Sequence, residues 1–244
     1  MLPRKPQIIA NLAPAAANDP QSDLRAGRAV VLVNKPCGML CQFTDAAGRR
    51  TLADLIDIPD VYPAGRLDAD SEGLVVLTSN GPLQARIAQP RSSLRKTYWV
   101  QVEGVPTAAQ LAALAGGVDL PDGRTRPAEA RAIAEPASLW PREPPIRVRR
   151  AIPTTWLELA LTEGRNRQVR RMIEAVGSKV RKLVRTAIGP VTISELSIGC
   201  YRPLNSDELK ALGARYADIR HANVKAPGKG DSPRRSGAKK RPPH

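Results

Sequence analysis

Three carboxylates stand close together in the segment Gly65–Thr78, which reads GRLDADSEGLVVLT. Asp68 follows Arg66 by two residues, and an apolar run typical of a strand begins six residues after Asp68. Loops that are positioned by a rigid element often carry the chemistry of a protein. A carboxylate in such a loop can act as a nucleophile, a base or a metal ligand, and the rest of the chain must decide between these roles.

Each of these roles has an alternative that needs no function. A turn aspartate commonly hydrogen-bonds its own backbone, and Asp68 fits that description too. Asp68, Asp70 and Glu72 alternate and in principle offer oxygen ligands to a divalent cation. Calcium loops of this kind need more oxygen ligands and a glycine at a different position, so we do not favour a metal site.

A second polar group is the segment Glu163–Met172, which reads EGRNRQVRRM. Gly164 lets the backbone approach a ligand closely, and Arg165 near a helix N-terminus suits an anion. Four arginines within seven residues fit contacts with phosphate and paired hydrogen bonds to carboxylates. The alternative is a basic helix face that is exposed to solvent.

Helical spacing separates these arginines into two kinds. A helix is predicted at about 166–176, with an apolar stripe on one face. At about 100° per residue, Arg167 and Arg171 point away from that stripe, as on a solvated face. Arg170 lies near its border and can reach a neighbouring cleft. The stripe consists of Val169, Met172, Ile173 and Val176.

A third group is Lys96-Thr97-Tyr98, at the start of a predicted strand over residues 96–104. Alternation places Tyr98, Val100 and Val102 on one face of that strand. A tyrosine at such a position is usually part of the core. Its alternative role is a platform for a flipped-out base, because aromatic rings stack on bases.

The overall charge indicates the kind of partner. The chain has 244 residues, with 38 basic and 23 acidic side chains and a net charge of +15. Residues 222–244 contain seven basic residues and one acidic residue, so residues 1–221 alone keep a strongly positive balance. This balance favours nucleic acid as the partner, against the alternative of a merely soluble basic surface.

Cysteine and histidine usage excludes several classes of chemistry. The odd count of Cys37, Cys41 and Cys200 argues against a disulfide framework, and their spacing does not provide the ligands of a zinc site. The only histidines are His221 and His244, which excludes a Ser-His or Cys-His pair in the body of the chain. No apolar run is long enough to span a bilayer and no secretory signal is evident, so we expect a cytoplasmic protein without a membrane partner.

The chain divides into a flexible N-terminal arm (1–27), a folded body (28–221) and a basic disordered tail (222–244). Short strands and short helices mix within the body, which predicts an α+β fold with a mixed or antiparallel sheet. The predicted strands are 29–33, 74–78, 96–104 and 156–162, the helices are 83–88, 107–115 and 166–176, and the Pro-rich stretch 136–153 is a loop or edge region.

Taken together, the motifs resemble the bacterial ribosomal RNA pseudouridine synthase family, in the branch of the small-subunit synthase A, with the greatest likeness to the large-subunit type E. The resemblance spans about residues 29–204 and implies the pseudouridine synthase fold, with helices flanking the sheet and a central catalytic cleft. The motifs that carry it are Asn34-Lys35-Pro36 with Gly38, Gly65–Thr78, Lys96-Thr97-Tyr98, Glu163–Met172, and Arg185 with Ile188-Gly189-Pro190, and the likeness to type E rests on Gln42–Asp45, Asp60–Tyr62 and Trp140–Arg142.

The resemblance implies isomerisation of one uridine in 23S ribosomal RNA by a monomer that needs no cofactor and no metal. Asp68 would be the nucleophile or base, Arg170 would pair with it, Tyr98 would hold the uracil, and Arg66 would fill the gap left by the flipped base. Phosphate contacts are expected from Lys35, Arg165 and Arg185. Two alternatives remain, a non-catalytic ribosome-assembly protein that binds rRNA and an RNA N-glycosidase.

Overall fold

The structure is a computed structural model that describes residues 30–89, 93–145 and 152–213. The predicted arm (1–27) and basic tail (222–244) lie outside the described residues, as do the exact ends of the predicted body (28–221). The strands are β1 (Val30–Lys35), β2 (Tyr62–Pro63), β3 (Glu72–Thr78), β4 (Lys96–Glu103), β5 (Asp119–Leu120), β6 (Gly123–Arg124), β7 (Glu129–Ile133), β8 (Thr154–Leu161), β9 (Val180–Ile188), β10 (Val191–Thr192) and β11 (Tyr201–Pro203). The helices are η1 (Leu52–Asp54, a 3-10 helix), α2 (Gly81–Ala88), α3 (Ala108–Gly116), α4 (Gln168–Ala175) and α5 (Ser206–Ala211).

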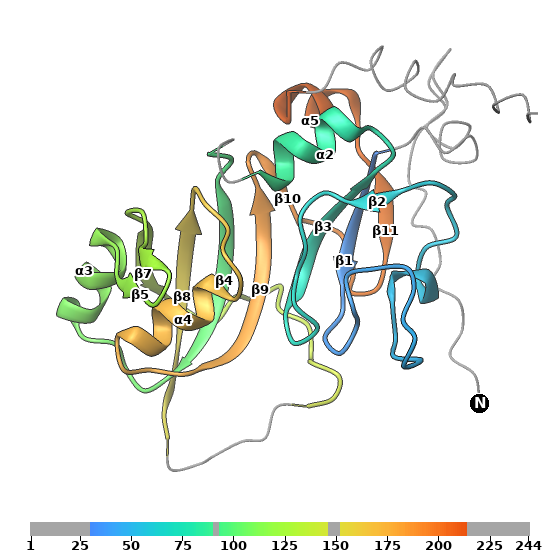
Figure 1. The fold of residues 1–244 in the computed structure, drawn as a ribbon. Coiled ribbons are helices and arrows are strands. Elements are labelled where there is room, and N and C mark those ends of the chain that lie inside the picture. The colour runs from blue at the N-terminus through green and yellow to red at the C-terminus, as the bar shows by residue number, and fades with distance from the viewer. Residues whose placement is uncertain (1–29, 90–92, 146–151, 214–244) are drawn as a thin grey trace, which may run out of the picture.

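One large sheet organises the molecule (Figure 1). Its strand order is β11-β1-β3-β9-β4-β8-β7, and β2 and β10 pair with β3 and β9 respectively. Every pairing is antiparallel except that of β3 with β9, which is parallel. The predicted α+β class with a mixed sheet is therefore confirmed.

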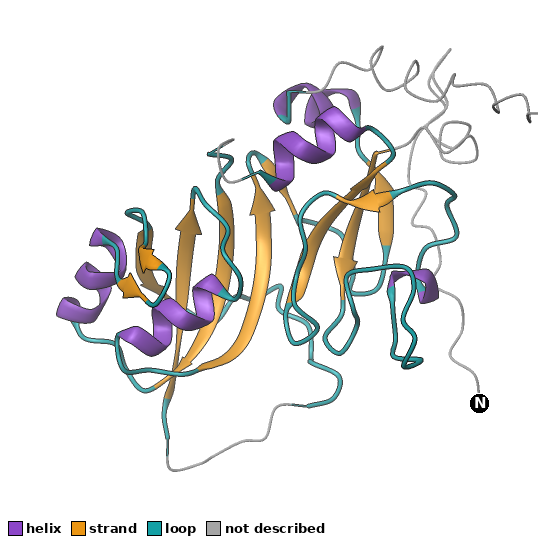
Figure 2. Cartoon of the chain, viewed as in Figure 1, coloured by secondary structure: helices purple, strands orange, loops and turns teal. Residues whose placement is uncertain are grey.

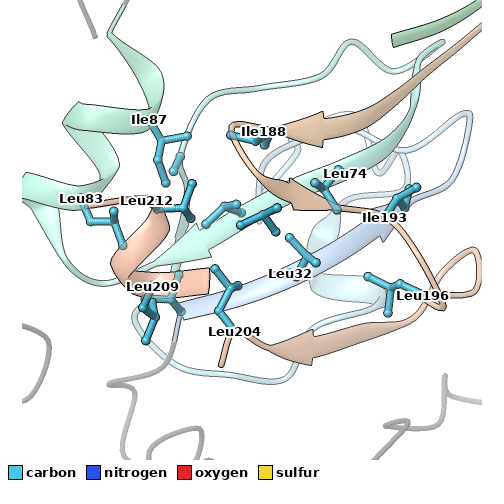
Figure 3. Packing of buried hydrophobic residues seen from close by; sticks show 14 residues of the cluster. Leu32, Leu74, Leu83, Ile87, Ile188, Ile193, Leu196, Leu204, Leu209 and Leu212 are labelled. Atoms are coloured by element: carbon cyan, nitrogen blue, oxygen red, sulfur yellow. The ribbon is translucent and has the colours of Figure 1, made fainter. Parts of the chain in front are cut away.

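The half of the sheet formed by β1 and β3 is covered on both faces. Every residue of these two strands is buried, including Asn34, Lys35 and Glu72, which explains the apolar runs at residues 30–33 and 74–77. On one face Leu32 and Leu74 pack against α2 and α5, as Figure 3 shows. On the other face Val33 and Val75 pack against residues between β1 and β2, such as Leu52.

The other half of the sheet is covered by α3 and α4 (Figure 2). Val100 of β4 and Leu159 of β8 pack there with Leu114 of α3 and Met172 of α4. Capping residues fix the first turn of two of the helices. Asn80 caps α2 and Thr107 caps α3 through side-chain hydrogen bonds to free backbone N–H groups.

The two halves meet where β3 and β9 pair, and this contact is short. Only Glu72 and Gly73 of β3 are in register with β9, opposite Val184 and Arg185. Gly73 has φ of +102°, and a Cβ atom there would collide with the backbone of Arg185. A glycine is required at this position because the two backbones approach so closely.

A buried ion pair strengthens this junction from one side. Lys182 Nζ lies 3.3 Å from Glu72 Oε2, and the two side chains are only 4% and 2% exposed. The indole Nε1 of Trp140 also donates a hydrogen bond of 3.0 Å to Glu72, and Lys182 donates one of 2.7 Å to the Trp140 carbonyl. Glu72, which looked like a metal ligand in the sequence, therefore holds the sheet together.

Candidate active site

A cavity of about 490 Å³ lies at the junction of the two halves. Its walls come from the loop before β3, the first residues of β4, the middle of β9 and the segment that joins β8 to α4. It gathers residues from four places far apart in the sequence. Five of the seven predicted site residues line it, namely Arg66, Asp68, Tyr98, Arg165 and Arg185.

Asp68 sits in a turn directly before β3. Its backbone carbonyl accepts a hydrogen bond of 3.1 Å from the Ser71 N–H, and its carboxylate is about one-third exposed at the cavity wall. Arg167 Nη1 lies 3.5 Å from Asp68 Oδ2. The carboxylate is thus held close to one cation and remains accessible to a molecule in the cavity.

Arg170 does not make the predicted ion pair with Asp68. Its Nη2 lies 3.2 Å from Asp70 Oδ1 and donates hydrogen bonds of 2.8 Å to the Asp70 carbonyl and 3.4 Å to Ser71 Oγ. The predicted pairing is wrong for this structure because Arg170 meets the loop from the side of Asp70. Arg170 therefore fastens the backbone that carries Asp68, and it does not line the cavity, so the expected reach into a neighbouring cleft is not seen.

Arg167 was predicted to lie on a solvated helix face, and the structure corrects this. The helix begins only at Gln168, and Arg167 has φ of +49° as its N-cap residue. The angular spacing of a helix does not apply to a residue outside it. Arg167 instead donates hydrogen bonds of 3.0 and 3.3 Å to the two carboxylate oxygens of Asp70 and lies beside Asp68.

The charges around Asp70 also explain its ionisation. Burial alone would raise the pKa of Asp70, but the hydrogen bond from Arg167 and the charges of Arg170 and Arg167 outweigh it and lower that pKa. Burial lowers the pKa of Arg170, and the charge of Asp70 partly offsets this. Arg171, the other arginine predicted to be solvated, pairs with Asp122 at 2.8 Å.

Tyr98 and Arg185 lie opposite each other on β4 and β9, next to an irregularity in the pairing of these strands. Bulges of this kind often redirect side chains at active sites. The Arg185 side chain is nearly buried, with its Nε donating 2.7 Å to the Leu74 carbonyl and its Nη1 donating 3.4 Å to the Arg66 carbonyl. Arg185 thus supports β3 and the Asp68 loop from the inner wall of the cavity.

Lys35 is the clearest correction among the predicted phosphate contacts. It is 0% exposed, and its ammonium donates to the carbonyls of Pro36 at 2.9 Å and Met39 at 2.8 Å. Burial lowers its pKa to about 8. A phosphate cannot reach this side chain, so the prediction for Lys35 is wrong and its visible role is to shape the turn after β1.

Arg165 lies at the cavity wall, but its guanidinium is largely occupied. It donates hydrogen bonds to the carbonyls of Gly123 at 2.8 Å and Arg124 at 2.7 Å, and it lies 3.4 Å from the carboxylate of Glu163. These contacts tie the β5–β6 hairpin to the segment before α4. A phosphate contact from Arg165 remains a prediction.

Arg66 differs from these arginines because it is exposed at the cavity mouth. Across residues 30–89, 93–145 and 152–213, no ion pair or side-chain hydrogen bond engages its guanidinium. Its charge is therefore available to a ligand, and the predicted contact with RNA remains untested.

Lys96 lines the cavity as well, and the sequence reasoning did not single it out as a site residue. It is 8% exposed. Burial and the neighbouring charge of Arg185 lower its pKa to about 8. The signal was present in the alternation of β4, since Lys96 stands two residues before Tyr98 and so faces the same way.

The described residues contain neither a metal-ligand cluster nor a helix that could span a membrane. No group of three or more His, Cys, Asp or Glu side chains in this part of the chain is arranged to hold a metal ion. None of the helices described has the length and apolar character needed to cross a bilayer. Asp70 and Glu72 point to different partners, Arg167 and Lys182, and do not converge on one point.

A cavity that combines an accessible carboxylate, an aromatic ring and several arginines suits an enzyme acting on a nucleic-acid base. The profile of the RNA pseudouridylate synthase family matches residues 29–175. The chain belongs to this family and is an RNA pseudouridine synthase. Members of this class are isomerases, so we assign the chain to the enzymes rather than to the non-catalytic RNA-binding proteins.

Individual relatives agree with this assignment. The chain is 53% identical over 180 residues to the ribosomal large subunit pseudouridine synthase E of Vibrio vulnificus, covering 74% of this chain and 76% of that protein. It is 56% identical over 170 residues to the synthase E of Xanthomonas axonopodis pv. citri, covering 69% and 90% respectively. A crystal structure of a pseudouridylate synthase superposes with a TM-score of 0.64 at 32% identity, covering 75% of this chain and 73% of that one. The predicted fold and the resemblance to type E are confirmed.

Proposed function

We propose that this protein converts one uridine of 23S ribosomal RNA to pseudouridine, acting as a monomer in the cytoplasm. The observation that carries the proposal is the high identity to large-subunit synthases of type E over about three-quarters of the chain. The net charge of +15 supports a polyanionic substrate.

The reaction needs no net gain or loss of atoms by the RNA. The C1′–N1 glycosidic bond breaks, the uracil turns, and a C1′–C5 bond forms. The hydrogen of C5 leaves as a proton, and N1 takes up a proton. This balance explains why the chemistry requires neither a redox partner nor an activated co-substrate.

Asp68 supplies the carboxylate of the reaction. It attacks C1′, attacks C6 or removes a proton from the sugar, and each of these steps requires an ionised carboxylate near the sugar–base junction. Arg167 lies 3.5 Å from that carboxylate, close enough to orient it through charge attraction. Arg170 acts by holding the loop at Asp70 and Ser71, so that the carboxylate faces the cavity.

Tyr98 provides the surface on which the flipped uracil rests, because it lines the cavity from the same wall as Arg185. Flipping a base costs a few kcal/mol of stacking, roughly. Arg66 at the mouth offsets part of this cost by filling the space that the base leaves in the RNA. We expect Arg165 and Arg185, which line the cavity, to contact the bound nucleotide.

Tritium release from ribosomal RNA labelled at C5 of uridine tests the proposal. An isomerase releases tritium and leaves the RNA chain and its bases in place. An N-glycosidase yields free uracil, and a binding protein yields neither product. Mapping pseudouridines in 23S RNA from cells that lack the protein then identifies the nucleotide, and an unchanged pattern would overturn the assignment to 23S RNA.

The second part of the proposal concerns the tail. Residues 222–244 carry seven basic residues and one acidic residue, and they add electrostatic affinity for RNA to the catalytic body (28–221). A protein ending at residue 221 should bind RNA more weakly and with a shallower dependence on salt concentration. Equal affinity of both proteins across a salt series would remove this role.

A further inference from the structure

Lys96 is a buried cation that faces the cavity without a countercharge. It is 8% exposed and lines the cavity beside Tyr98 and Arg185. In the three described stretches of the chain, no carboxylate forms an ion pair with its ammonium, and no hydrogen bond from it is found. Burying an unpaired charge costs free energy. A ligand atom that carries negative charge would offset this cost when it is bound.

The neighbour of Lys96 makes the local charge more positive. Arg185, on the adjacent strand, is 4% exposed, and its charge opposes protonation of Lys96. The Arg185 Nη2 atom is buried and has no hydrogen-bond partner among the described residues. Two neighbouring cations, one with an unused donor, form a site for an electron-rich oxygen.

The depth of the site decides which part of a nucleotide supplies that oxygen. Arg66 is exposed at the mouth, and Asp68 is about one-third exposed, whereas Lys96 and Arg185 are nearly buried. A flipped nucleotide keeps its phosphates near the RNA strand at the mouth and sends its base inward. The group that meets Lys96 is therefore the uracil ring.

We propose that Lys96, supported by Arg185, binds a carbonyl oxygen of the flipped uracil and stabilises the negative charge that the ring acquires during the reaction. This proposal rests on the proposed function. It assigns Lys96 a direct contact with the reacting base, in addition to the carboxylate of Asp68 and the ring of Tyr98.

The charge balance of the reaction supports this role in each route open to Asp68. When the C1′–N1 bond breaks, its electron pair stays on the uracil and spreads onto the ring oxygens. When a nucleophile adds to C6, the electron pair of the ring double bond moves toward O4. Lys96 keeps its proton throughout. The electron pair of the ring forms the new bond from C5 to C1′, and loss of the C5 proton with protonation of N1 completes the reaction. A preorganised donor at the site of developing charge typically contributes about 10²–10³-fold in rate.

Substitution of Lys96 by two residues, compared with an exposed lysine, tests the proposal. Lys96→Met removes charge and donor, Lys96→Gln keeps a donor without charge, and Lys179→Met makes the same change at an exposed position outside the cavity. The measurements are single-turnover tritium release from a 23S RNA transcript labelled at C5 of uridine, filter binding of that transcript, and thermal unfolding.

We expect Lys96→Met to slow tritium release by at least about 100-fold and Lys96→Gln by less. Both variants should bind the transcript within about threefold of the wild type, because the RNA backbone contacts at the mouth are intact. Lys179→Met should match the wild type. The melting temperature of Lys96→Met should not fall, since methionine has a similar length and the buried charge is removed.

Two results would overturn the role of Lys96. One is release by Lys96→Met within threefold of the wild type, and the other is a loss of RNA affinity as large as the loss of rate, which would indicate a phosphate contact. If only one of the two Lys96 variants has the wild-type circular dichroism spectrum, the rate and affinity of that folded variant decide whether the role of Lys96 stands. Absence of tritium release by the wild type would contradict the proposed function itself, which separates the two failures.

Discussion

The end of strand β1 and the inner wall of the cavity each contain a buried lysine with a pKa lowered to about 8, namely Lys35 and Lys96. Lys35 donates to two backbone carbonyls and so has a fixed structural use. Lys96 has neither a hydrogen bond nor an ion pair within the described residues, and it faces open space. A structural lysine and a proposed functional lysine thus share burial and a lowered pKa. They differ in what the ammonium group meets, which is backbone carbonyls for Lys35 and the cavity for Lys96.

The same contrast separates two groups of ionised residues. Glu72 and Lys182 are buried and satisfied by each other and by Trp140. Asp68 and Arg167 are partly exposed and face the cavity. Changes in the first group should reduce stability, and changes in the second should reduce activity while the protein stays folded.

The largest expected effect is on the reaction itself. Asp68→Asn should slow tritium release by more than about 10³-fold because the amide can act neither as a nucleophile nor as a base. RNA affinity and melting temperature should change little, since the side chain keeps its size. Asp60→Asn is a matched control at an exposed turn with φ of +57°. Full turnover by Asp68→Asn would refute the proposed chemistry.

Breaking the buried ion pair should give the largest loss of stability. Glu72→Gln leaves the charge of Lys182 buried without its partner, which typically costs about 3–5 kcal/mol in free energy of unfolding. Urea denaturation measures this change. The control is Glu158→Gln, which breaks an exposed pair with Arg131 and should cost less than about 1 kcal/mol. Equal losses in the two variants would contradict the structural role of the buried pair.

Arg170 should show a smaller effect on the reaction. Arg170→Gln removes the contacts to Asp70 and Ser71, so the loop that carries Asp68 shifts, and such misplacement can cost about 10²-fold in rate. The melting temperature should fall only slightly. The neighbouring Arg171→Gln loses a pair with Asp122, outside the cavity lining, and should keep the wild-type rate. A similar loss of rate in both variants would mean that the position of the loop does not depend on Arg170.

The smallest expected effect is on the free energy of unfolding, and its dependence on pH compares the two buried lysines. The pKa of Lys96 is lowered from 10.5 to about 8 in the folded state, so the unfolded chain binds more protons between these values and stability rises with pH there. At pH 7 Lys96 is charged in both states, so the folded protein bears the full cost of burying that charge. Lys96→Met should therefore raise the free energy of unfolding by about 1–3 kcal/mol at pH 7, and this gain should shrink above pH 8.

Lys35→Met provides the comparison for that measurement. This substitution also removes the cost of burying a charged lysine. However, the carbonyls of Pro36 and Met39 then lose their hydrogen-bond donor, which costs about 1–3 kcal/mol. No net gain is therefore expected at pH 7. Urea denaturation at several pH values measures both variants. A gain in Lys35→Met as large as that in Lys96→Met would show that the two lysines are equivalent.

Local patterns in the sequence were enough to locate several elements and part of the cavity. The apolar runs of β1 and β3, the alternation of β4, and the capping residues Asn80 and Thr107 each act within a few residues, so they can be interpreted without tertiary contacts. The strands β7, β9 and β11 and the helix α5 were not predicted. In β9, the charged residues Lys182 and Arg185 interrupt the apolar pattern that would predict a strand. Their partners Glu72 and Leu74 are about a hundred residues away in the sequence, so nothing local shows that these charges are satisfied inside the fold.

The sequence by itself determined the family, the α+β class and the placement of Asp68 and Tyr98 at one cavity, because these depend on local motifs in a given order. Only the tertiary structure decided how the charges are paired. It assigned Arg170 to Asp70, brought Arg167 beside Asp68, buried Lys35 and turned Lys96 toward the cavity. The physical reason is that ion pairing and desolvation depend on atoms brought together by folding, which no spacing along the chain specifies.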